Sequence, residues 1–189
     1  MRIFVIRHAE HVSGHLTTDG KLQAQRISYE LDGEFSKVVH SRIQSAVDTA
    51  EFIASGCPVV MVPKEEISIW DHALNHSEKR RLHKMVDEIV QRGEGTLIVT
   101  HQTVLNAIED IYELEEISDE YCCGACLESD DGKLEVLYHL IPDEEWVNWV
   151  EWRRDCSGPI TCQRCGRLEI DYGVERCPEC GEEFEARHL

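Results

Sequence analysis

The chain has 189 residues, a length that accommodates one compact domain and a small additional module. With 42% hydrophobic and 30% charged residues it is not a disordered chain, and no apolar run approaches the roughly 20 residues of a membrane span. A formal net charge of -18 would repel nucleic acids and anionic lipid surfaces, so we expect neither as a partner. The nine cysteines are an odd number, and no signal-peptide layout precedes the first apolar run, which favours a cytoplasmic location.

Short β-branched segments alternate with longer amphipathic segments in the first part of the chain. The predicted strands are residues 2–6, 37–40, 58–62 and 96–100. The predicted helices are residues 18–31, 43–55, 78–92 and 104–114, and Thr17 and Asn75 are suitable N-caps. This alternation is typical of a sheet with helices on both faces. We therefore predict an α/β three-layer sandwich with a mostly parallel sheet.

The pattern changes after this alternation. Within residues 124–140, two short apolar runs flank Asp130-Asp131-Gly132-Lys133, which predicts a hairpin that adds edge strands to the sheet. Residues 144–155 carry apolar side chains at helical spacing, and the composition changes around Cys156. The expected units are a domain of residues 1–142, a connecting helix of residues 143–155 and a small module of residues 156–189.

Two CxxCG motifs characterise the small module. The motifs are Cys162-Gln163-Arg164-Cys165-Gly166 and Cys177-Pro178-Glu179-Cys180-Gly181. Eleven residues lie between Cys165 and Cys177, a spacing that brings four thiolates around one tetrahedral ion. The pattern resembles zinc ribbons and also rubredoxin, in which iron occupies the same type of cage. We expect a structural zinc, with iron as the alternative, because so short a module cannot bury enough apolar surface to fold alone. The module is also a possible docking surface for a protein partner.

Four motifs in the first domain occur in a specific order. They are Arg7-His8-Ala9 at the end of the first strand, Leu16 to Ala24, Ser41 to Ala50, and Val99-Thr100-His101 at the end of a later strand. Together they resemble the histidine phosphatase superfamily, the phosphoglycerate mutase-like proteins, over roughly residues 1–142. The corresponding family patterns are RHG, LTxxGxxQA, SxxxRAxxTA and a strand that ends in V-T-H.

The resemblance implies a role for each matched polar residue. His8 would be the nucleophile that accepts the phosphoryl group, and Arg7 and His101 would hold the phosphate oxygens. Neutral imidazole is nucleophilic near pH 7, and guanidinium binds phosphate through two parallel hydrogen bonds. This chemistry needs no cofactor. Further substrate-binding candidates are Thr17, Ser41 and Arg42.

One departure from the family pattern concerns the second phosphate-binding arginine, whose position is occupied here by Ser45. Arg42 lies three residues earlier, and residues i and i+3 share a helix face, so its guanidinium either compensates or points into solvent. Without compensation the protein would be a weak enzyme or a non-catalytic relative. His11 and His15 are near enough in sequence to line the mouth of the pocket, but we expect surface positions for both.

The general acid is the second uncertain position. The family often has L-x-E after the third strand, which points to Glu66, with Asp71 as the alternative. A leaving alkoxide needs a proton, whereas an N-phosphoryl group needs much less help. The identity of the acid is therefore linked to the identity of the substrate.

These observations favour a phosphatase that hydrolyses a phosphomonoester or phosphohistidine on a small molecule or a protein. The segments around the expected pocket are too short for an elaborate lid, which opposes a mutase because a mutase must keep its intermediate away from water. The alternative from another class is a catalytically weak or inactive phosphate-binding adaptor whose zinc ribbon docks a partner. A rubredoxin-like electron carrier is the third hypothesis.

Overall fold

The computed structural model describes residues 2–31, 33–55, 58–130 and 133–141, together with the short strands β9 (Ile160–Thr161) and β10 (Leu168–Glu169). The chain divides into two compact units, Met1–Asp143 and Glu144–Leu189. In the second unit β9 and β10 pair antiparallel. The helix predicted over residues 143–155 and the four cysteines of the predicted zinc ribbon lie outside the described residues. Among the helices that are described, none is long and apolar enough to span a membrane.

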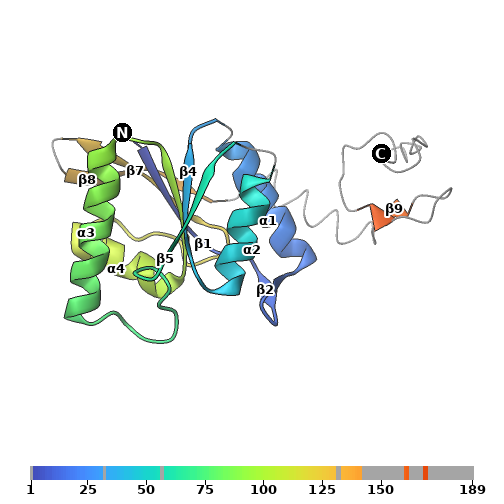
Figure 1. Ribbon diagram of the computed structural model, residues 1–189, viewed down its shortest axis with the longest axis horizontal. Helices are drawn as coiled ribbons and strands as arrows, with labels where there is room; N and C mark the ends of the chain where they lie inside the picture. The colour runs from blue at the N-terminus through green and yellow to red at the C-terminus, as the bar shows by residue number, and fades with distance from the viewer. Residues whose placement is uncertain are drawn as a thin grey trace. The chain divides into compact units, whose positions relative to one another are not determined.

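The first unit is built on a six-stranded sheet with the order β5-β4-β6-β1-β7-β8. Its first four strands are parallel to one another, and β7 and β8 form an antiparallel hairpin that pairs with β1 (Figure 1). The strand bounds are β1 (Arg2–Arg7), β4 (Lys37–Ser41), β5 (Val60–Lys64), β6 (Thr96–Thr100), β7 (Gly124–Asp130) and β8 (Lys133–Leu140).

Two pairs of helices cover opposite faces of this sheet (Figure 1). One pair is α1 (Thr18–Glu30) and α2 (Gln44–Ala54), and the other is α3 (His76–Arg92) and α4 (Gln102–Tyr112). Side chains alternate along β1, so Phe4 and Ile6 pack with the α1 and α2 core while Ile3 and Val5 pack with the α3 and α4 core. The predicted three-layer sandwich is confirmed.

The helix starts follow the capping chemistry of the sequence. Thr17 caps α1 by accepting a hydrogen bond from the backbone N–H of Gly20. Asn75 and Glu78 form a reciprocal capping box at the start of α3, which therefore begins two residues before its first expected position. The polar first turn of α3 carries no apolar periodicity, so its cap is the better sequence signal for the start of the helix.

A small hairpin between β1 and α1 was not predicted. Strands β2 (His11–Val12) and β3 (His15–Leu16) pair antiparallel across a turn in which Ser13 and Gly14 both have positive φ, 54° and 85°. Two-residue strands are too short to produce a recognisable alternation in the sequence. The hairpin decides where His11 lies.

Candidate active site

The carboxyl ends of the parallel strands bring the predicted site residues to one edge of the sheet. In the pairing of β1 with β6, Arg7 lies opposite Thr100, so His8 and His101 follow at neighbouring positions. The backbone N–H of His8 donates to the carbonyl of Thr100 at 2.9 Å, and the two imidazole ring centres are 5.0 Å apart. Two motifs that are more than 90 residues apart in the sequence therefore meet at this edge.

His8 is held in one orientation and in its neutral form. Its side chain is buried, with the residue only 6% exposed, and Nδ1 lies 3.0 Å from the carbonyl oxygen of Ala9. Because a carbonyl only accepts hydrogen bonds, Nδ1 carries the proton and Nε2 keeps its lone pair. Burial lowers the pKa of His8 to about 4, with further lowering by His11 and Arg7. His8 is thus a neutral imidazole with a free nucleophilic nitrogen near pH 7.

His101 is buried beside it and is fixed by Ser41. The Nε2 atom of His101 lies 2.8 Å from Oγ of Ser41, which also accepts a hydrogen bond from the backbone N–H of Ile43 at 3.1 Å. Burial lowers the pKa of His101 to about 3, and the positive fields of His8, His11 and Arg7 act in the same direction. Ser41, a predicted substrate-binding residue, therefore contacts His101 and fixes its ring.

Arg7 projects from the end of β1 onto Tyr121. Its guanidinium donates to the carbonyl of Asp119, and its central carbon lies 4.1 Å from the centre of the Tyr121 ring. The Tyr121 ring centre is 5.6 Å from that of His8. Within the described part of the chain, the covered Nε of Arg7 has no hydrogen-bond partner. Tyr121 was not identified from the sequence, because it lies in a loop outside every motif.

Side chains from both neighbouring helices hold the loop that follows His8. The backbone N–H of Ala9 donates to Oγ1 of Thr49 on α2 at 3.0 Å, and that of Glu10 donates to Oε1 of Gln23 on α1 at 2.9 Å. Gln23 belongs to the second motif and Thr49 to the third. In this structure their side chains fix the backbone that follows His8.

Thr17 and Gly20 belong to the same support. Besides capping α1, the Thr17 hydroxyl donates to the carboxylate of Glu10 at 2.8 Å. A Cβ at Gly20 would lie 2.0 Å from the backbone oxygen of Glu10, so only glycine permits this approach of α1 to the loop. Thr17, a predicted substrate-binding residue, uses its hydroxyl for this support in the described structure.

Ser45, which stands where the family pattern has its second arginine, is buried. Ser45 is 2% exposed and lies on α2. Arg42 precedes Ile43, the extended N-cap of that helix, so Arg42 and Ser45 do not share a helix face and the i, i+3 argument for compensation does not hold. The Arg42 side chain is 61% exposed and lies 3.8 Å from the carboxylate of Glu65. The structure does not bring Arg42 to His8 or His101.

His11 contacts His8 directly. Its ring centre lies 4.7 Å from that of His8, with the two planes at 80°, and 6.3 Å from that of Tyr121. The residue is half-buried, so the expectation of a surface position was wrong. Its Nδ1 is covered and, among the residues described, has no hydrogen-bond partner. The sequence gives no signal for this position, because the contact depends on the β2-β3 hairpin.

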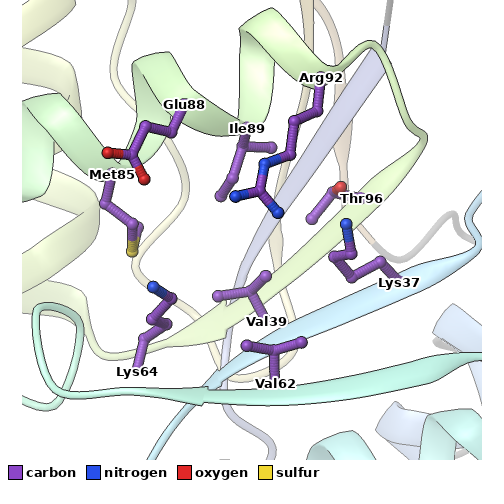
Figure 2. A pocket seen from close by; sticks show the side chains of 9 residues that line it. All are labelled: Lys37, Val39, Val62, Lys64, Met85, Glu88, Ile89, Arg92 and Thr96. Carbon is purple, nitrogen blue, oxygen red and sulfur yellow. The ribbon is translucent and has the colours of Figure 1, made fainter.

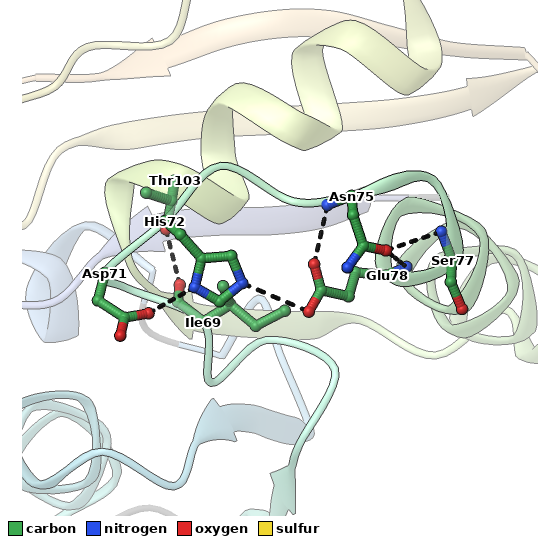
Figure 3. Close-up of polar contacts among 7 residues, drawn as sticks. All are labelled: Ile69, Asp71, His72, Asn75, Ser77, Glu78 and Thr103. Atoms are coloured by element: carbon green, nitrogen blue, oxygen red, sulfur yellow. Dashed lines mark hydrogen bonds and ion pairs between the residues drawn. The ribbon is translucent and has the colours of Figure 1, made fainter.

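Of the two candidate acids, Glu66 lies on the loop that is tied to the histidine edge. The hydroxyl of Thr100, the residue before His101, donates to the carbonyl of Ile67 at 2.9 Å. The hydroxyl of Thr103 donates to the carbonyl of Ile69 at 2.7 Å (Figure 3). Glu66 itself is half-buried. These bonds hold the segment that carries Glu66 beside the end of β6.

Asp71 is exposed and belongs to a different network (Figure 3). Its carboxylate lies 2.7 Å from Nδ1 of His72, and Nε2 of His72 lies 3.4 Å from Glu78. The hydrogen bond with His72 lowers the pKa of Asp71 and raises that of His72. A lowered pKa makes Asp71 a poor proton donor at neutral pH. The network instead joins this loop to the capped start of α3.

No family model and no curated protein matches the sequence. Solved structures do match. YhfR of Bacillus stearothermophilus is 20% identical with a TM-score of 0.58, over 72% of this chain and 95% of that one. The protein histidine phosphatase SixA, complexed with tungstate, is 16% identical with a TM-score of 0.58, over 74% and 96%. A phosphoserine phosphatase of Entamoeba histolytica is 12% identical with a TM-score of 0.58, over 75% and 98%.

The first unit has the phosphoglycerate mutase-like fold. At these identities the likeness concerns the fold, and the chemistry has to be argued from the residues. In this fold the four parallel strands end at His8, Ser41, the Glu66 loop and His101. The structure therefore brings the sequence motifs together at the edge of the sheet that was predicted, the carboxyl ends of the parallel strands.

A separate cavity of about 110 Å³ lies between α3 and the strands β4, β5 and β6. Valines and Ile89 form its apolar part, and the side chains of Lys64 and Arg92 point into it from opposite ends (Figure 2). Lys37, a third cation of this groove, is paired with Glu94. None of the histidine-edge residues lines this cavity, so the groove and the candidate active site are distinct.

The described residues offer no group of three histidine, cysteine or carboxylate side chains arranged to hold a metal ion. Cys162, Cys165, Cys177 and Cys180 fall outside those residues. Cys122, Cys123 and Cys126 are buried and free. Burial raises the pKa of each of these three thiols, so they act as small apolar side chains.

Proposed function

We propose that this chain is a phosphatase that hydrolyses a phosphomonoester or a phosphohistidine through a phosphohistidine intermediate on His8. One observation carries the proposal. His8 is buried and neutral, its Nδ1 faces the Ala9 carbonyl, and its ring lies next to that of His101. This arrangement leaves Nε2 as an unprotonated nucleophile beside the guanidinium of Arg7, the side chain best suited to phosphate.

The proposed reaction has two steps. In the first, Nε2 of His8 attacks phosphorus, a phosphorus–nitrogen bond forms, and the bond from phosphorus to the leaving group breaks. Glu66 gives its proton to the leaving oxygen. In the second step, Glu66 takes a proton from water, the oxygen of that water bonds to phosphorus, and the phosphorus–nitrogen bond breaks. Inorganic phosphate leaves, and both His8 and Glu66 return to their starting states.

Arg7 and His101 stabilise the transferring group in both steps. The covered Nε of Arg7 lacks a hydrogen-bond partner within the described residues, and a phosphoryl oxygen would supply one. His101 is fixed by Ser41, so a hydrogen bond from its ring to the phosphoryl group needs no reorganisation. The names of two structures with this fold, a protein histidine phosphatase and a phosphoserine phosphatase, support substrates on either a protein or a small molecule.

Trapping of the intermediate tests this function. A radiolabelled phosphomonoester, quenched in alkali during turnover, should leave label on the wild-type chain, because phosphohistidine is stable to base and labile to acid. His8→Ala should take up no label. His83→Ala, which changes an exposed histidine on α3, should retain it. Turnover without any trapped label in rapid-quench experiments, or equal turnover by His8→Ala, would overturn the proposal.

A phosphate-binding adaptor without useful turnover is the second candidate. The observation in its favour is the covered Ser45 together with the outward ion pair of Arg42, which leave the site with fewer fixed cations. An adaptor should bind a phosphate analogue and show no release of phosphate above that of His8→Ala. The two candidates therefore differ in turnover, while both require binding.

We further propose that Cys162, Cys165, Cys177 and Cys180 hold one structural zinc ion. The support is the chemistry of the donor set, because four thiolates at this spacing suit a tetrahedral, borderline-soft ion. The ion would stabilise the small module, which then serves as a docking surface for a protein partner. Elemental analysis of protein purified without chelator should give about one zinc per chain. Iron in its place, or no metal, would contradict the assignment.

A further inference from the structure

We propose that His11 supplies the second positive charge of the phosphate site and takes up a proton when phosphate binds. This inference rests on the proposed function, because it concerns the same site. It assigns to a histidine on a two-residue strand the task that the resemblance gives to an arginine on α2. The site would then be sensitive to pH in a range where an arginine-based site is not.

The geometry leaves a place for such a residue. Ser45 is covered and uncharged, and Arg42 is paired with Glu65 in solvent. The described structure thus brings one permanent cation, Arg7, to the nucleophile. A phosphate dianion held by a single guanidinium retains uncompensated charge in a buried setting, which is costly.

His11 lies where that charge would be compensated. The β2-β3 hairpin holds its ring 4.7 Å from the ring of His8, nearly perpendicular to it, and 6.3 Å from the ring of Tyr121. Its covered Nδ1 has no hydrogen-bond partner in the part of the chain that is described. An unpaired ring nitrogen next to the nucleophile is a group that a bound oxyanion would satisfy.

The groups around His11 link the charge of its ring to the binding of a phosphate dianion. Its ring contacts those of His8, which follows β1, and Tyr121, in the loop before β7. Both His11 and Arg7 interact electrostatically with His8 and with His101, which precedes α4. The neighbouring Glu10 carboxylate accepts a hydrogen bond from Thr17. A bound dianion next to this ring would favour its imidazolium form.

His11 is more exposed than the other two histidines of this cluster. Burial keeps His8 and His101 neutral, since it lowers both of their pKa values far below neutrality. His11 is only half-buried. If its ring takes up a proton when a dianion binds, the affinity for the dianion falls as pH rises, by up to about tenfold for each pH unit.

Binding of tungstate to the full chain tests this inference between about pH 6 and pH 8.5. Tungstate is a dianion throughout that range, so a pH dependence belongs to the protein. Calorimetry in two buffers of different ionisation enthalpy gives the number of protons taken up. We expect about one per tungstate for the wild type near pH 7.5 and an affinity that falls as pH rises.

Substitutions assign the proton. His11→Ala should bind tungstate about tenfold to a hundredfold more weakly at pH 6, with little pH dependence. His11→Arg should remove the pH dependence while keeping tight binding. His15→Ala is the matched control, since His15 lies on the neighbouring strand of the same hairpin but is 82% exposed and paired with Asp48. It should behave as the wild type.

The outcomes separate this inference from the proposed function. If the wild type binds tungstate without proton uptake, or if His11→Arg retains the full pH dependence, the charge does not reside on His11 and the inference is overturned. The wild-type proton count decides this even where a variant fails to fold. If the wild type shows neither tungstate binding nor turnover, the proposed phosphatase itself fails.

Discussion

Two regions of this acidic chain gather histidine, lysine and arginine side chains, and they do so differently. At the histidine edge, Arg7 and His8 are fixed by backbone carbonyls, and His101 is fixed by Ser41. In the α3 groove, Lys64 and Arg92 extend from opposite ends over apolar side chains (Figure 2). The groove encloses a cavity of about 110 Å³, and the histidine edge holds its side chains in fixed orientations with lowered pKa values of His8 and His101, as catalysis needs.

The predicted site residues lie at the carboxyl ends of parallel strands, and none of them lines the cavity beneath α3. The groove lies beneath α3, where Arg92 is exposed and Lys37 is already neutralised by Glu94. Flexible lysines over an apolar surface lose rotamer freedom when they bind a ligand. The preorganised edge avoids that loss.

The largest expected difference in kcat/KM is between an alanine substitution at the histidine edge and one in the groove. His8→Ala should lower kcat/KM for a phosphomonoester by at least about a thousandfold, because the nucleophile itself is removed. Lys64→Ala in the groove should leave kcat/KM within about twofold. Steady-state kinetics on the two purified variants measure both values. A large loss in Lys64→Ala would mean that the groove takes part in the reaction.

The second effect concerns the two candidate acids. Glu66→Gln should lower kcat about a hundredfold for an alkyl phosphate, whose alkoxide needs a proton, and much less for a nitrophenyl phosphate. Asp71→Asn should change neither rate appreciably, because Asp71 is exposed and its pKa is lowered by His72. The ratio of rates for the two substrates isolates proton donation. An unchanged ratio in Glu66→Gln would remove Glu66 from the role of acid.

The third effect concerns the support of the histidine edge. Gly20→Ala would bring a methyl group against the backbone oxygen of Glu10, so α1 and the loop after β1 have to separate. We expect a loss of about 1–3 kcal/mol in the free energy of unfolding, together with a lower kcat. Chemical denaturation and kinetics measure the two. Lys21→Ala, one position further along α1, is the control, and an unaffected Gly20→Ala would mean that the loop is not held rigidly.

The fourth effect is on the pH dependence of stability. Burial lowers the pKa of His8 to about 4 and that of His101 to about 3 from an ordinary value of 6.5. Below pH 6.5 the unfolded chain therefore binds more protons than the folded chain, and the free energy of unfolding falls as pH falls. Each histidine should contribute a loss of about 2 kcal/mol between pH 7 and pH 5.

Denaturation at both pH values tests this expectation. The His8→Gln and His101→Gln variants should each lose less stability on acidification than the wild type. His83→Gln, on the exposed face of α3, should follow the wild type. An identical loss in all four proteins would show that other groups control the acid sensitivity.

The sequence predicted most of this fold because the periodicity and the strand ends are local signals. The four parallel strands and four helices lie within two residues of their expected bounds. His8, Ser41 and His101 were proposed from motifs that resemble a family and that follow or end predicted strands, and the structure brings these strand ends to one edge. His11 and Tyr121 were missed because their contacts depend on a short hairpin and on an irregular loop, which leave no periodic trace.

Arg42 shows the opposite error. Its spacing from Ser45 predicted a place in the phosphate site, but the structure places its side chain in solvent beside Glu65. The i, i+3 argument assumed that Arg42 and Ser45 share a helix, but α2 begins at Gln44 after an extended Ile43. The exact first residue of a helix is hard to predict from sequence, because assigned helix ends differ by one or two residues. One residue's shift in the helix start is enough to change which face a side chain occupies.

The smallest expected effect follows from that shift. Arg42→Ala removes an exposed ion pair with Glu65, and exposed pairs contribute about 0–1 kcal/mol. We expect kcat/KM to change by less than about threefold, which is smaller than the loss of tungstate affinity, about tenfold to a hundredfold, expected for His11→Ala. Measuring kcat/KM of Arg42→Ala and of His11→Ala under the same conditions compares Arg42 and His11 as sources of the second positive charge. A tenfold loss in Arg42→Ala with none in His11→Ala would mean that Arg42 turns inward when substrate binds, and the second charge would then belong to the loop before α2.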